Sequence, residues 1–181
     1  MQARFPARSC YNPAMTTGTA VSVEEYLRTS YEPSCEYVDG VLVPKAMGTR
    51  KHGKIQARLP ALIETAFPQY EVITELTVRI TGKQYLIPDL SVYLRDQVQD
   101  PYPIAPVHLC IEIVSPDDRL REIFVKCETY HAWGCPHTWV LDPLTRRAWQ
   151  YAKGTAAPIE VTGELTAGDI HLSVADIFAA L

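Results

Sequence analysis

The sequence has no long hydrophobic run. Its longest apolar stretch, residues 105–114, is interrupted by His108 and Glu112, and it is well short of the roughly 20 residues that a transmembrane helix needs. No apolar signal-peptide core precedes the first cysteine either. We therefore expect a protein without a membrane span, located in the cytoplasm.

Basic residues are not in excess. The 181 residues include 17 Lys and Arg against 21 Asp and Glu, which gives a formal net charge of −4. A chain of this charge has no global positive field that would attract a nucleic acid. A polyanionic partner would have to be bound through a local cluster of basic side chains.

Paired cysteines are also missing. The five cysteines are odd in number and show no Cys-x2-Cys spacing, which favours reduced thiols over a disulfide framework. Cys127, His131, Cys135 and His137 could be drawn together as a zinc site. However, Cys127 falls on an apolar helical stripe, and Cys135 and His137 fall where the chain turns into a strand, so we favour core positions.

What is present is typical of one globular domain, which we place at residues 21–181. The chain is 47% hydrophobic and 21% charged, close to the averages of soluble domains. Residues 1–20 contain Arg4 and Arg8, no acidic residue and no apolar periodicity, so we expect a disordered leader. It is either a basic arm or the product of a start codon upstream of the true one at Met15, and its two charges favour the second explanation.

Local patterns predict alternating helices and strands. Ser22 and Glu25 form a capping box before a short helix, and Asp39–Gly40 separates two β-rich runs as a hairpin turn. Pro60 should kink or split the helix that the pattern predicts at residues 50–67. Further strands are expected at 71–80, 85–94, 107–115, 137–142 and 147–151, and further helices from Ser115 to about 134 and at 173–181. This order predicts an α/β fold with a mixed β-sheet core flanked by helices, preceded by a helix–hairpin extension.

A pair of carboxylates is the main candidate for chemistry. Asp89 is expected inside one strand and Glu112 inside an almost entirely apolar one. A buried glutamate is costly unless it is compensated, and a divalent metal shared with a neighbouring carboxylate would do so. Lys126 flanks the apolar stripe of the next helix, from where it could reach both acids. The alternative is that Glu112 pairs with a basic residue or meets water at a strand end.

Several short motifs follow one another in a fixed order: residues 23–27 (VEEYL), 36–40 (EYVDG), 52–55 (HGKI), 88–92 (PDLSV), 112–116 (EIVSP), 126–130 (KCETY) and 139–143 (WVLDP). In this order and spacing they resemble the Uma-type restriction endonuclease family, within the PD-(D/E)XK nuclease superfamily. The resemblance implies a restriction-endonuclease-like core with a four-stranded mixed sheet. It also implies that Asp89, Glu112 and the carbonyl of Ile113 are metal ligands. Hard oxygen ligands of this kind select Mg²⁺ or Mn²⁺ over zinc.

The resemblance assigns roles to further residues. Val114 stands where the superfamily pattern has a lysine, and Lys126 on the following helix is the implied replacement. Glu36 and His52 are implied accessory residues, as a further metal ligand and a polar contact. A surface glutamate and a core histidine are the alternatives.

These observations favour a metal-dependent endonuclease that hydrolyses DNA. The basic cluster Arg50, Lys51, Lys54 and Arg58 would contact nucleic acid, and a homodimer would present this cluster twice. Two alternatives remain open: a non-catalytic binding or assembly protein that keeps the fold, and a metal-dependent hydrolase of another substrate.

Overall fold

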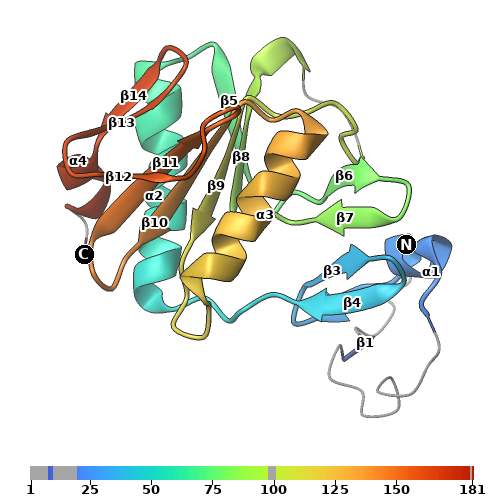
Figure 1. Ribbon diagram of the computed structural model, residues 1–181. Helices are drawn as coiled ribbons and strands as arrows, with labels where there is room; N and C mark the ends of the chain where they lie inside the picture. Colours follow the sequence, from blue (N-terminus) through green and yellow to red (C-terminus); the bar gives the residue numbers. More distant parts are fainter. Residues whose placement is uncertain (1–7, 10–19, 98–100, 180) are drawn as a thin grey trace, which may run out of the picture.

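The centre of the molecule is a six-stranded mixed sheet (Figure 1). The computed structural model describes residues 8–9, 20–97, 101–179 and 181. In spatial order the strands are β12 (Ile159–Val161), β11 (Arg147–Ala152), β10 (His137–Asp142), β9 (Leu109–Ile113), β8 (Leu90–Leu94) and β5 (Tyr70–Thr74). Strands β9 and β10 are parallel and are joined by the crossover helix α3 (Leu120–Trp133), whereas the other neighbours are antiparallel. The predicted mixed α/β fold is thus confirmed.

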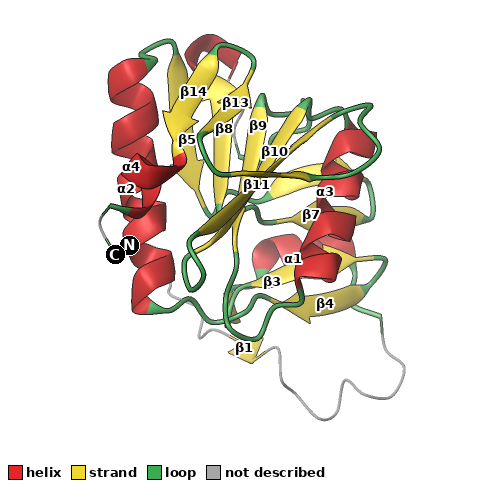
Figure 2. Cartoon of the chain, turned by 60° about the vertical axis from the view of Figure 1, so that its left-hand side comes forward, coloured by secondary structure: helices red, strands yellow, loops and turns green. Residues whose placement is uncertain are grey.

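Helices cover both faces of this sheet (Figure 2). The helices α2 (Arg50–Ala66) and α4 (Val174–Phe178) lie on one face, and α3 lies on the other. Alternate residues of β9, such as Ile111, join the core under α2, while Cys110 packs in a separate cluster with Tyr130 of α3. The period of two along a strand therefore turns Glu112 toward α3.

A smaller four-stranded sheet lies beside the first. Its order is β4 (Val41–Pro44), β3 (Cys35–Val38), β7 (Gln84–Leu86) and β6 (Val78–Thr81). The strands β3 and β4 pair across the turn Asp39–Gly40, where both residues have positive φ, as the two-residue hairpin turn requires. Helix α1 (Val23–Arg28), capped by Ser22 as expected, packs its Tyr26 on Tyr37 and Tyr85 of this sheet.

Two expected strands are each divided between the sheets. The run 71–80 forms β5 and β6, with Glu75 at φ +53° between them. The run 85–94 forms β7 and β8, separated by residues 87–89, where Pro88 has no N–H to donate to a ladder. The sequence predicted Asp89 inside a strand, and this is wrong. Asp89 lies at the point where the chain passes from one sheet to the other.

The structure corrects two expectations about helices. Helix α2 is continuous from Arg50 to Ala66 and is not split at Pro60, because its buried face, including Ile55, Leu59 and Ile63, is held by the core. Helix α3 begins at Leu120 and not at Ser115. Ser115 instead closes a turn in which its N–H donates to Asp118 Oδ2 at 2.8 Å.

The remaining elements are short. The hairpin of β13 (Glu164–Ala167) and β14 (Ile170–Ser173) packs into the core under α2. Of the expected leader, Arg8–Ser9 form β1, parallel to β2 (Tyr31–Glu32), whereas Arg4 and Met15 lie outside the described residues.

The expectations about thiols and membranes have different outcomes. Cys35 takes part in a disulfide, so the five cysteines are not all reduced, whereas Cys110, Cys127 and Cys135 are free and buried. None of the helices within the described part of the chain has the length and hydropathy of a membrane span.

Candidate active site

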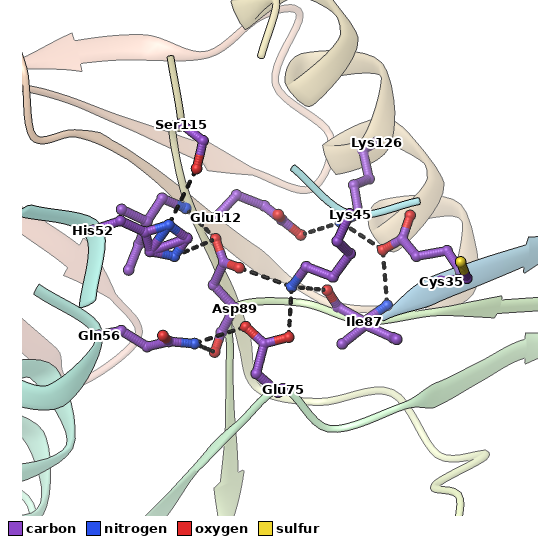
Figure 3. A network of polar contacts seen from close by, with 12 residues as sticks. Cys35, Lys45, His52, Gln56, Glu75, Ile87, Asp89, Glu112, Ser115 and Lys126 are labelled. Atoms are coloured by element: carbon purple, nitrogen blue, oxygen red, sulfur yellow. Dashed lines mark hydrogen bonds and ion pairs between the residues drawn. The ribbon is translucent and has the colours of Figure 1, made fainter. Parts of the chain in front are cut away.

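Asp89 and Glu112 meet where the two sheets adjoin (Figure 3). Strands β8 and β9 pair Leu90 with Ile111 in antiparallel register, so one further step along the pair sets Asp89 opposite Glu112. Both are buried, with 3% and 6% of their surface exposed. The structure therefore brings together the two carboxylates that the sequence singled out.

Glu112 is held by two side chains of α3. Lys126 Nζ lies 2.9 Å from Glu112 Oε1, and the Tyr130 hydroxyl donates to the same oxygen at 2.6 Å. Lys126 and Tyr130 are four residues apart and so lie on one face of the helix. No described residue hydrogen bonds with Glu112 Oε2, which leaves that oxygen available to a ligand.

Glu36 holds Lys126 from the smaller sheet. Its Oε1 lies 2.7 Å from Lys126 Nζ and accepts a hydrogen bond from the Ile87 N–H at 2.8 Å. The predicted accessory residue is thus part of the cluster, and its contact there is with the lysine.

Asp89 is held by Lys45, a residue that sequence reasoning missed. Lys45 Nζ donates to Asp89 Oδ1 at 2.8 Å, to Glu75 Oε2 at 2.9 Å and to the Ile87 carbonyl at 2.9 Å. The other carboxylate oxygen, Asp89 Oδ2, accepts from the Ile113 N–H at 2.7 Å. Lys45 follows the end of β4, so only the placement of the hairpin against the larger sheet reveals its role.

His52 completes the cluster from the first turn of α2. Its Nε2 lies 3.5 Å from Asp89 Oδ2, and its Nδ1 lies 3.2 Å from Ser115 Oγ. The ring is buried, and Nε2 makes no hydrogen bond with a described residue. His52 therefore connects the start of α2 to Asp89 and Ser115 and forms the α2 side of the cleft.

Burial and mutual repulsion disturb the titration of this cluster. Burial raises the pKa of Glu112 to about 7; Lys126 and Lys45 oppose that shift, and Asp89 and Glu36 add to it. Burial also disfavours the charged form of Lys126, but Glu112 and Glu36 outweigh it and the pKa of Lys126 is raised. Lys126 is therefore protonated at neutral pH, and it acts as a hydrogen-bond donor and a positive charge.

These residues line a cleft of about 360 Å³ between the hairpin and α3. Five carboxylates and three lysine or arginine side chains border it. The acids that are not part of the cluster are Asp118 and Glu122, near the start of α3, where Arg119 pairs with Glu122 at 3.6 Å. The cleft is acidic overall, as a site for a divalent cation would be.

The four basic residues of α2 that the sequence grouped together, Arg50, Lys51, Lys54 and Arg58, do not share one surface environment. Arg58 Nε donates to the Asp176 carbonyl of α4 at 3.0 Å, on the side away from the cleft. Arg50 and Lys51 line a groove next to the cleft, and Lys54 is exposed.

The residues weighed as a zinc site have separate contacts. Cys127 lies in the core cluster under α3, and Cys135 Sγ donates to the His137 carbonyl at 3.0 Å. His131 Nε2 lies 3.4 Å from Thr138 Oγ1. Each side chain is thus accounted for by its immediate surroundings.

Comparison with solved structures gives one match with the same fold among the two described here. A crystal structure described as "a putative nuclease belonging to DUF820 from Anabaena variabilis ATCC 29413" matches with a TM-score of 0.77 and 22% identity, over 88% of this chain and 98% of that chain. A cryo-electron microscopy structure of a DrdV–DNA complex matches with a TM-score of 0.43 and 19% identity, over 62% of this chain and 10% of that chain. No curated protein matches the sequence.

The family comparison covers most of the chain. The model of the Uma2 family, described as "Putative restriction endonuclease", matches residues 23–175. This range contains both carboxylates, both lysines and His52. The chain therefore belongs to the Uma2 family.

Proposed function

We propose that the protein is a metal-dependent endonuclease that hydrolyses phosphodiester bonds of DNA. The observation that carries the proposal is the pair of buried carboxylates, Asp89 directly before β8 and Glu112 in the adjacent β9, with Lys126 Nζ 2.9 Å from Glu112. Family membership supports the nuclease class. Metal dependence and DNA as the substrate are the parts that need experiment.

The residues of the cleft fit a hard divalent cation. The described part of the chain contains no group of three or more His, Cys, Asp or Glu side chains that could hold a metal ion by themselves. Mg²⁺ commonly binds through one or two carboxylates, completing its shell with water and substrate phosphate. Asp89 and Glu112, with the Ile113 carbonyl, would supply such a partial shell. Glu112 Oε2, which has no described partner, is the oxygen best placed for it.

A bound Mg²⁺ or Mn²⁺ would polarise the phosphoryl oxygen and lower the pKa of a bound water. The chain's own residues prepare the surroundings for that chemistry. Glu36 and Glu112 hold the Lys126 ammonium, which has a third N–H left to orient water or to donate to a phosphoryl oxygen as negative charge develops. Lys45 and the Ile113 N–H hold the Asp89 carboxylate in position.

Nicking of supercoiled plasmid DNA in Mg²⁺ or Mn²⁺ tests the proposal. We expect Asp89→Asn, Glu112→Gln and Lys126→Met each to lose at least about a hundredfold in rate. Glu122→Gln is the matched control, because it makes the same chemical change at the exposed mouth of the cleft, and it should retain activity.

Other outcomes would reject the proposal. Equal nicking by wild type and all variants would mean a contaminating nuclease. Calorimetry with Mn²⁺ then separates the alternatives. Binding without DNA cleavage would indicate a hydrolase of another substrate, and failure to bind would indicate a non-catalytic member of the fold.

A further inference from the structure

A second groove, of about 520 Å³, opens directly beside the candidate active site. The two hollows share Ser115 and Asp118 as lining residues. The segment 114–118, which follows β9 and its Glu112, forms part of both. A polymer bound across Glu112 would therefore continue into this groove.

The lining of the groove includes two cations, Arg50 and Lys51. Arg50 and Lys51 are the first residues of α2, and its first turn contains no acidic residue. Neither makes an ion pair or a side-chain hydrogen bond with any residue that the structure describes. Cations at the amino end of a helix are unfavourable because they meet the positive end of its dipole. A phosphate between them would turn this repulsion into attraction.

An apolar wall of the groove is formed by Val114, Pro116, Leu120, Pro143 and Leu144. The carboxylates Asp118 and Asp142 also line the groove, and both accept hydrogen bonds from backbone N–H groups of their own turns. Leu144 is 72% exposed, yet its position is held, since its N–H donates to Asp142 Oδ1 at 2.8 Å. The Thr145 hydroxyl and N–H bind the same Asp142 carboxylate. An exposed leucine in a groove that also contains two cations without a described partner suits a ligand that is anionic on one side and apolar on the other.

We infer that this groove binds one nucleotide of the DNA strand next to the cleaved phosphodiester, with its base out of the helical stack. The inference rests on the proposed function and refines its substrate. Arg50 and Lys51 would contact the backbone phosphate, and the apolar wall would contact the base or sugar. A base can reach such a wall only when it is unpaired or flipped out. The protein should therefore prefer single-stranded DNA, or duplexes with an unpaired base, to fully paired duplex.

Fluorescence anisotropy with a labelled single-stranded oligonucleotide and the matching duplex tests this inference, with Ca²⁺ in place of Mg²⁺ to prevent turnover. We expect wild type to bind the single strand more tightly. The double variant Arg50→Ala/Lys51→Ala should bind at least tenfold more weakly, with a salt dependence smaller by one to two phosphate contacts. Leu144→Ser should weaken binding of the single strand about tenfold, because it removes the apolar surface that the base would cover, and of the duplex much less.

Lys153→Ala is the matched control, because Lys153 is exposed and its N–H binds Pro136 at the opposite end of β10. It should bind within twofold of wild type. Folded variants of Arg50, Lys51 and Leu144 that bind like wild type would overturn the inference, even if cleavage still depended on Glu112. If these variants bind more weakly but the wild type cleaves no DNA, the groove would still be a nucleotide-binding site, and the proposed nuclease activity would be rejected. If wild type binds neither oligonucleotide, both proposals fail.

Discussion

Replacing Lys45 with methionine tests how the site is held together. The change keeps the apolar stem and removes the ammonium that binds Asp89, Glu75 and the Ile87 carbonyl. The Lys45 and Asp89 side chains are only 14% and 4% exposed, and breaking a buried ion pair costs about 3–5 kcal/mol because a charge is left uncompensated. Glu75 is 44% exposed, so its share is small. Because the Ile113 N–H still binds Asp89, we expect a loss of about 3 kcal/mol.

Urea unfolding followed by circular dichroism, in EDTA at pH 8, measures this loss. Lys153→Met is the control at an exposed site and should stay within about 0.5 kcal/mol of wild type. The double variant Lys45→Met/Asp89→Asn should recover part of the loss, with a coupling energy of about 2 kcal/mol. A loss below about 1 kcal/mol for Lys45→Met would refute the view that Lys45 compensates the buried charge of Asp89.

Three further predictions concern the titration of Glu112 and the helix α2. The pKa of Glu112 is raised from 4.5 to about 7, first by burial, so its stabilising contribution is complete below about pH 4.5 and is lost as pH rises through about 7. Unfolding in EDTA should show this decline for wild type and a flatter profile for Glu112→Gln; identical profiles would contradict it. Tyr130→Phe removes the hydroxyl that donates to Glu112 at 2.6 Å, so it should lower the free energy of unfolding by about 1–2 kcal/mol. Because this hydrogen bond favours the ionised carboxylate, its loss should also move the decline to higher pH. An unmoved profile would exclude a coupling between Tyr130 and the titration of Glu112. Pro60→Ala restores a backbone donor inside α2 and should raise the unfolding free energy by about 1–3 kcal/mol, seen as a higher melting temperature; a lower one would mean that the proline ring packs productively.

Local patterns were sufficient for much of the fold. The hairpin around Asp39–Gly40 depends on two residues that accept positive φ, and β10 occupies residues 137–142 as expected. Asp89, Glu112 and Lys126 were found because each is a charged residue in an apolar context, and such a residue is costly to bury alone. The structure places all three in one cleft.

The remainder depended on contacts between distant segments. An alternating run does not reveal which strand it will pair with, so the division of 71–80 and 85–94 between two sheets could not be read from alternation alone. Pro88 was the one local signal of a break, since it cannot donate to a ladder. Lys45 was missed because its partners Glu75 and Asp89 are 30 and 44 residues away in sequence.

The basic residues in the cleft and those at the start of α2 have different surroundings, and we expect them to have different roles. Lys45 and Lys126 each bind two carboxylates. Their positive charges therefore mainly neutralise acidic side chains of the protein itself. Beyond the one N–H that Lys126 has left for the reacting phosphoryl group, they do not supply the several phosphate contacts by which proteins usually bind DNA. Arg50 and Lys51 lie outside the acidic cleft and have no described partner. The salt dependence of DNA binding should therefore arise at the start of α2, while the lysines of the cleft determine whether bound DNA is cleaved.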